Sequence, residues 1–182
     1  MALENSAELR QVLTDDSRLG RVFARHAYGM RAWVDLLSAR IAGIDDPRVK
    51  ALVASVVGDN ARHMILFRNR ALAHGVDPDA YVCPSEGQAI YTRLEELTSI
   101  DELVGYALGS LDHFVELLEV YADAAGPEDL VAIEAVRADV DRTRMMLREL
   151  AGIAGVRLAE EAHELYRVRE LAETPRYLLD HD

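Results

Sequence analysis

Apolar side chains recur at spacings of three and four residues along four long stretches of the chain. In the first stretch, for example, Phe23, Met30 and Leu37 follow one another at intervals of seven residues. This spacing places an apolar stripe along one face of a helix, and such a stripe is buried against neighbouring helices. The pattern therefore predicts long amphipathic helices over residues 17–44, 47–74, 100–125 and 128–151, and shorter ones over 5–13, 88–97 and 158–171.

Capping residues mark the ends of the predicted helices. Asp46 precedes Pro47, which combines an acidic N-cap with proline at the first helical position. Ser99 and Glu102 have the spacing of a capping box, in which each side chain satisfies a free backbone N–H. Residues 75–96 hold several prolines and glycines and predict a surface crossing between the second and third long helices. The fold class is therefore all-α, and residues 1–182 form one domain.

The second and fourth long helices are related by a shift of 80 residues, in which Asp59 falls on Asp139 and Arg62 falls on Arg142. Each copy of such a repeat is one supersecondary unit that needs its neighbour to close a core. A two-fold relation between the copies would bring the two Asp–Arg pairs close together. They are then either structural ion pairs that join the two hairpins by bidentate hydrogen bonds, or exposed pairs within single helices.

Two helical hairpins with tight turns, joined by a crossing of about 25 residues, make the second and third long helices run parallel. In length, order and internal two-fold this arrangement resembles the ferritin-like superfamily of di-iron-type bundles, over roughly residues 17–151. The resemblance implies a four-helix bundle with a long crossover between its second and third helices, plus a C-terminal helix. An ordinary up-down bundle and a helical fold of the heme-oxygenase type are the alternatives.

The net charge limits the classes of binding partner, and the cysteine content indicates the cellular compartment. The net charge of −12 argues against nucleic acid and anionic membranes, because binding to phosphates requires a surplus of Lys and Arg. Cys83 is the only cysteine, so no internal disulfide is expected, and a reducing cytoplasmic location is predicted. No apolar run approaches the length of a membrane span.

The positions that carry iron ligands in ferritin-like proteins hold other residues here. The resemblance implies a Glu on the first and third helices and a Glu-x-x-His on the second and fourth. Asn60 and His63 occupy that motif on the second helix, and Val140 and Thr143 occupy it on the fourth. The first helix offers His26, and the third helix offers Tyr106, with Ser110 one turn away. A di-iron centre of the usual kind is therefore not expected, and the metal-ligand motif is degenerate.

At the height of these positions in the bundle, polar side chains still interrupt the apolar stripes of the helices. Buried polar groups cost roughly 1–3 kcal/mol each unless they find partners, so these residues either bond one another in a relict network or surround a ligand. The functional interpretation is a pocket for a small organic molecule, with no cofactor, that supports acid–base chemistry such as isomerisation, cyclisation or dehydration. The candidate catalytic residues are His63, His26 and Asn60, and the candidate ligand-binding residues are Tyr106, Ser110, Thr143, Tyr28 and Trp33.

Two further hypotheses belong to other classes. One is a metal-dependent oxidase or oxygenase that holds iron or manganese with an irregular ligand set, drawn from His26, His63, His113, Asp139 and Glu116. In the competing interpretation, His113 and Glu116 lie on the bundle surface. The other hypothesis is a non-catalytic scaffold that associates through its C-terminal helix and acidic surface, for which a homodimer is one assembly to expect.

Overall fold

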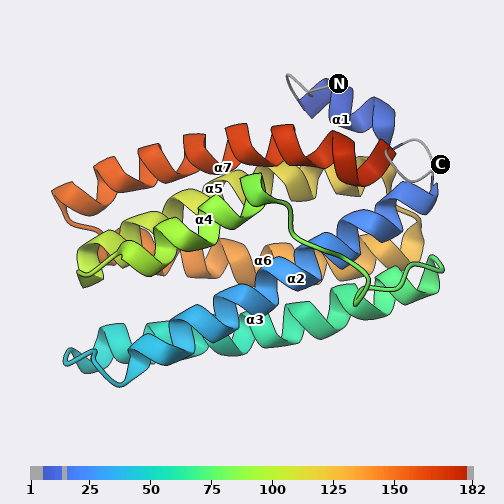
Figure 1. The fold of residues 1–182 in the computed structure, drawn as a ribbon. Helices are drawn as coiled ribbons and strands as arrows, with labels where there is room; N and C mark the ends of the chain where they lie inside the picture. The colour runs from blue at the N-terminus through green and yellow to red at the C-terminus, as the bar shows by residue number, and fades with distance from the viewer. Residues whose placement is uncertain (1–5, 14–15, 180–182) are drawn as a thin grey trace.

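The computed structural model describes residues 6–13 and 16–179 and shows helices joined by turns and one longer crossing (Figure 1). Over these residues no strand is formed, so the predicted all-α class is confirmed. Within them, no helix is both long and apolar enough to cross a membrane. The predicted start of the first helix at Asn5 lies outside the described residues. The helices are α1 (Ser6–Val12), α2 (Asp16–Ile41), α3 (Pro47–Ala73), α4 (Ser85–Glu96), α5 (Ile100–Ala124), α6 (Pro127–Leu150) and α7 (Ile153–Leu179).

Two pairs of long helices form antiparallel hairpins, as predicted. Helices α2 and α3 are joined by a short turn, and the Asp46 side chain accepts a hydrogen bond from the backbone N–H of Arg48 at the start of α3. Helices α5 and α6 are joined through Gly126 and Pro127, and the capping box of Ser99 and Glu102 is formed at the start of α5. Local sequence signals therefore set the boundaries of the four long helices to within a few residues.

The crossing between the hairpins carries α4 along the bundle. Its C-terminal carbonyl groups accept hydrogen bonds from the Arg40 guanidinium, at Leu94, Glu95 and Leu97. A second tie comes from the Tyr106 hydroxyl, which donates to the Ile90 carbonyl over 2.8 Å. These bonds fix α4 against α2 and α5, so that α4 forms part of the wall of the bundle interior.

The C-terminal helix differs from the prediction. Helix α7 begins five residues earlier than residue 158 and continues to Leu179, past the predicted end at residue 171. Asp101 explains the early start, because its carboxylate accepts hydrogen bonds from the backbone N–H groups of Gly152 and Gly155 over 3.0 Å each. Acidic groups stabilise free N–H groups at a helix start. Helix α7 thus packs lengthwise on α5 as a fifth long helix of the bundle (Figure 1).

Close packing of α5 on α7 depends on glycine. A Cβ atom at Gly105 would lie 2.2 Å from the carbonyl oxygen of Gly155, and one at Gly109 would lie 2.1 Å from that of Ala159. Neither distance is compatible with a side chain, so the two backbones approach one another only because both positions lack a Cβ. This contact brings the polar residues of α7 up to those of α5.

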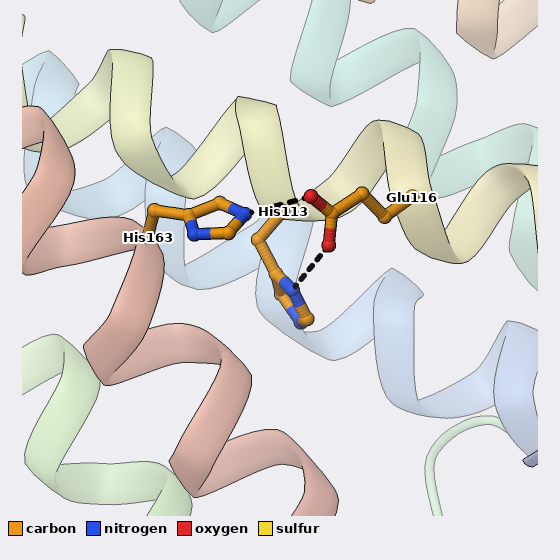
Figure 2. A group of neighbouring side chains, drawn as sticks. All are labelled: His113, Glu116 and His163. Carbon is orange, nitrogen blue, oxygen red and sulfur yellow. Dashed lines mark hydrogen bonds and ion pairs between the residues drawn. The ribbon is translucent and has the colours of Figure 1, made fainter. Parts of the chain in front are cut away.

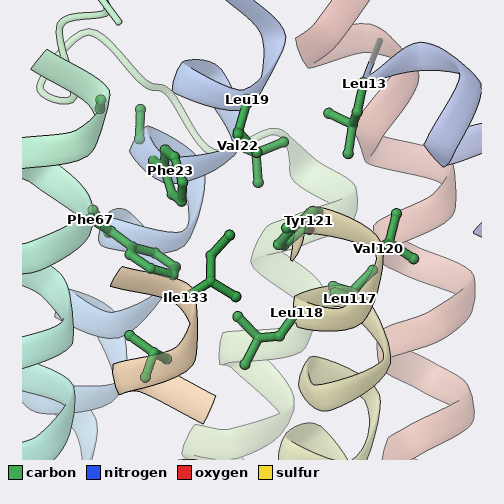
Figure 3. Packing of buried hydrophobic residues seen from close by; sticks show 14 of the residues in the cluster. Leu13, Leu19, Val22, Phe23, Phe67, Leu117, Leu118, Val120, Tyr121 and Ile133 are labelled. Carbon is green, nitrogen blue, oxygen red and sulfur yellow. The ribbon is translucent and has the colours of Figure 1, made fainter. Parts of the chain in front are cut away.

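The hydrophobic core is divided into two clusters along the bundle. One of them packs Phe23 against Phe67 with ring centroids 4.9 Å apart, next to the buried Ile133 (Figure 3). Leu130 occupies a position of the apolar stripe on the fourth long helix but is 39% exposed, and its neighbour Asp129 is buried instead. Asp129 turns inward because it accepts hydrogen bonds from Arg70, over 2.7 Å, and pairs with His74, over 3.0 Å.

Candidate functional site

A cavity of about 90 Å³ lies between α2, α3, α4, α5 and α7. Its volume exceeds the roughly 10–15 Å³ that one water molecule needs. Helix α2 contributes Gly29, which carries no side chain into the cavity, and α4 contributes Gly87. The residues that line it are Arg25, His26, Gly29, Met30, Trp33, Val56, Asn60, Tyr81, Gly87, Ile90, Tyr91, Ala107, Ser110, Leu111, His113, Phe114 and Tyr166.

Three of the predicted polar residues lie on this wall. The His26 imidazole is hydrogen bonded to the Tyr121 hydroxyl through Nε2, over 2.8 Å. The Asn60 amide donates to the Val56 carbonyl, and the Ser110 hydroxyl donates to the Ala107 carbonyl, over 2.9 Å in both cases. Asn60 and Ser110 therefore each donate a hydrogen bond within their own helix, while His26 is held from another helix.

Aromatic side chains make up much of the remaining wall. Trp33, which was predicted as a ligand-binding residue, lines the cavity together with Tyr81, Tyr91, Phe114 and Tyr166. Tyr166 was not singled out from the sequence, which predicted a C-terminal helix without a place for it in the bundle interior. Burial raises the pKa of the Tyr166 hydroxyl well above its ordinary value, so this group is a neutral phenol.

Two predicted tyrosines lie outside the cavity lining. The Tyr106 ring stacks at an angle on Trp33, with centroids 6.3 Å apart, and its hydroxyl is used by α4. Burial raises the Tyr106 pKa above its ordinary range. Tyr28 contacts Tyr81 and Tyr91 by its ring edge, with centroids 5.2 and 6.0 Å apart. These residues support the aromatic wall from behind instead of facing a ligand.

His63 and Thr143 line a second, smaller pocket of about 30 Å³. Asn60 borders both spaces. The His63 imidazole meets the Asp139 carboxylate through Nε2, over 3.0 Å. Burial lowers the pKa of His63 and outweighs the opposing effect of Asp139, so the ring is neutral at pH 7 and donates its Nε2 proton to the carboxylate. The polar level predicted as one site is thus divided into two neighbouring spaces.

The repeated Asp–Arg pairs meet on the outer side of His63. Arg142 bonds Asp139 over 2.7 Å and reaches Asp59 over 3.4 Å, while Arg62 bonds Asp59 and reaches Asp139 over 3.3 Å. The pairs are therefore formed both within each helix and across the two helices. Burial tends to raise the pKa of Asp139, but the hydrogen bonds from His63 and Arg142 outweigh it and hold that pKa at about 2.

The irregular metal set predicted from the sequence is not brought together as one site. His26 pairs with Tyr121, and His63 and Asp139 pair with one another on α3 and α6. His113 and Glu116 belong to a different group on α5. His113 is only 3% exposed and lines the cavity, so its predicted alternative place on the bundle surface is wrong.

The partner that His113 and Glu116 meet is His163 of α7, which sequence reasoning missed. The His163 imidazole is hydrogen bonded to Glu116 through Nε2, over 2.9 Å (Figure 2). The available signal was the pair of glycines at 105 and 109 on α5, which match the small residues at 155 and 159 on α7. Small residues at such spacing allow close helix contact.

Comparisons with known proteins leave the chain's family open. No family model matches it, and neither a curated protein nor a solved structure matches it.

Proposed function

We propose that the protein binds a small, largely apolar organic molecule in the central cavity and acts on it by acid–base chemistry. The lining of the cavity is the observation that carries this proposal: Trp33, Phe114 and three tyrosines surround a space that also meets His26, Asn60 and Ser110. Binding sites for small molecules combine apolar walls with a few convergent polar groups in this way. A volume of about 90 Å³ is smaller than the engineered apolar cavity of about 150 Å³ that binds benzene, so the ligand is expected to have no more than one ring.

His26 and His63 are the candidate acid–base groups. His26 lines the cavity and is oriented by the Tyr121 hydroxyl. His63 is neutral and oriented by Asp139, as a general base requires, and Asn60 separates its pocket from the cavity. This chemistry suits an isomerisation, a cyclisation or a dehydration that needs no cofactor.

The bundle itself is best assigned to the ferritin-like type with a degenerate di-iron motif. Support comes from the hairpins α2–α3 and α5–α6, which are joined by the long crossing that carries α4. At the level of the expected ligands, α3 offers Asn60 and His63, and α6 offers Val140 and Thr143. Oxygen-activating di-iron sites use several carboxylates at these positions. Their absence here favours a pocket for an organic ligand over a di-iron site.

The single tryptophan provides a direct test, because Trp33 lines the cavity. Phenol and benzoate would be titrated into the protein with excitation of Trp33 at long wavelength. Saturable changes in emission are expected for the wild type. They should be lost in Ser110→Leu, because the larger side chain fills the cavity.

Thr143→Val is the matched control, since this residue lines only the smaller pocket. It should keep the response to phenol and benzoate. A wild type that responds to neither compound, or a Ser110→Leu variant that responds like the wild type, would contradict the proposal and favour the scaffold.

A further inference from the structure

Two imidazoles and a carboxylate converge where α5 and α7 touch. The Glu116 carboxylate lies between the two histidines, 2.9 Å from His163 Nε2 and 3.9 Å from His113 Nδ1 (Figure 2). The two rings are nearly perpendicular, with centroids 5.9 Å apart. One ligand atom from each residue lies within 4.8 Å of the other two. Over the described part of the chain, this is the one such group of three His, Cys, Asp or Glu side chains.

The backbone holds this group in place. His113 and Glu116 are three residues apart, so they lie on the same face of α5. Gly109 lies one turn before His113, and a Cβ there would be 2.8 Å from the backbone nitrogen of His163. Because that Cβ is missing, α7 presents His163 to Glu116 across a direct backbone contact. The three side chains thus come from rigid helices and not from a loop.

The Arg167 guanidinium, whose charge acts on Glu116, is hydrogen bonded to another carboxylate. Arg167 lies one turn after His163 on α7, and it donates two hydrogen bonds to Glu164, over 2.7 and 2.8 Å. The two groups that face Glu116 are instead imidazoles, and each offers a nitrogen lone pair when neutral.

We propose that His113, Glu116 and His163 bind one divalent first-row transition metal ion. Two imidazole nitrogens and one carboxylate oxygen are ligands that zinc, iron, cobalt and manganese share, with bonds of about 2.0–2.2 Å. Glu116 and His163 have 52% and 30% of their side chains exposed, so they can close around the ion while the buried His113 stays fixed. Three protein ligands leave coordination positions open for water or a substrate. The ion would adjoin the central cavity, because His113 also lines it.

This proposal does not rest on small-molecule binding, so metal binding would be measured directly. Protein purified without a polyhistidine tag and treated with chelator would be titrated with Zn²⁺ by calorimetry, and with Co²⁺ by visible absorption. One ion per chain is expected. His163→Ala and Glu116→Gln should each weaken binding by more than tenfold, since even the loss of an outer partner of a ligand costs about 10–100-fold.

Two matched variants serve as controls. Glu119→Gln removes an exposed carboxylate one turn further along α5, and His63→Gln removes a histidine that meets a carboxylate elsewhere in the bundle. Both should bind Zn²⁺ as the wild type does. Failure of the wild type to bind, unchanged affinity in both His163→Ala and Glu116→Gln, or loss of binding in His63→Gln in place of these variants would overturn the proposal.

Discussion

Two groups in this bundle each place a buried imidazole beside a carboxylate, but the side chains around the two carboxylates differ. In the His63 cluster (His63, Asp59, Arg62, Asp139 and Arg142), the Asp139 carboxylate meets one imidazole and two guanidinium groups. In the His163 cluster (His113, Glu116 and His163), the Glu116 carboxylate lies between two imidazoles.

The difference decides what each carboxylate can do. Arginine is a permanent cation that donates hydrogen bonds and does not coordinate metal ions. In the His63 cluster, arginine side chains therefore already pair with the carboxylate. That cluster therefore joins α3 to α6 and orients His63, while burial of the ring keeps its imidazole neutral. In the His163 cluster, the carboxylate is flanked by two imidazoles, whose nitrogen lone pairs can coordinate a cation together with the carboxylate. The three predictions below test this comparison, beginning with the largest expected effect.

The two clusters each lie beside a glycine, and these glycines should respond in opposite ways to alanine. Gly109→Ala places a Cβ 2.1 Å from the Ala159 carbonyl oxygen, so α5 and α7 must separate. Overpacking typically costs about 1–3 kcal/mol and more where backbone must move. We expect the free energy of unfolding to fall by about 3 kcal/mol, as measured by urea denaturation.

Gly58→Ala is the control beside the His63 cluster. Its Cβ would lie 3.8 Å from the Arg62 guanidinium, which is an ordinary contact. Alanine is favoured over glycine within a helix by up to about 1 kcal/mol, so this variant should be neutral or more stable. Equal losses in the two variants would show that the α5–α7 contact is not specially close.

Acid should weaken the His63 cluster through Asp139. Its folded pKa of about 2 lies below the ordinary 3.8, so between these values the unfolded chain holds more protons, and stability falls as the pH is lowered. At about 1.4 kcal/mol per pKa unit, reduced for a side chain that is 24% exposed, this amounts to about 1–2 kcal/mol. Asp139→Asn should lose that stability at pH 7 and show a flatter decline from pH 5 downward.

Asp141→Asn provides the comparison on the same helix. Asp141 is 46% exposed and pairs with Arg144, away from His63. Its removal should cost less than that of Asp139 and leave the acid dependence in place. If urea denaturation at pH 7 and pH 3 gave the same difference for both variants, Asp139 would have no special role.

The sequence predicted the His63 cluster but only His113 and Glu116 of the His163 cluster, and the reasons are physical. The 80-residue repeat related Asp59 and Arg62 to Asp139 and Arg142, and a repeat predicts which helices are neighbours. His163 lies on α7, which has no counterpart in the repeat. Its position depends on a backbone contact at Gly105 and Gly109, and periodicity alone does not show which helix packs there.

The division of the central polar level into two spaces was also beyond the sequence. Asn60 and His63 lie on neighbouring parts of α3, yet only Asn60 reaches the larger cavity. Large side chains such as Phe114 and Met30 border both spaces and separate them. Helical spacing predicts the face on which a residue lies, whereas the rotamers of such side chains decide which space it lines.

The smallest effect concerns the protonation of His63, which reports on the balance of charges in its cluster. Burial lowers its pKa below the ordinary 6.5, the carboxylates of Asp139 and Asp59 act in the opposite direction, and the Arg62 charge adds to the lowering. Asp139→Asn should therefore lower the His63 pKa further, because burial stays while an attractive negative charge is lost. Arg62→Gln should raise it. Histidine side-chain NMR over a pH series would follow both changes, and a wild-type His63 that titrated above 6.5 would mean that its imidazole is a charged ion-pair partner and not the neutral base that the proposed chemistry needs.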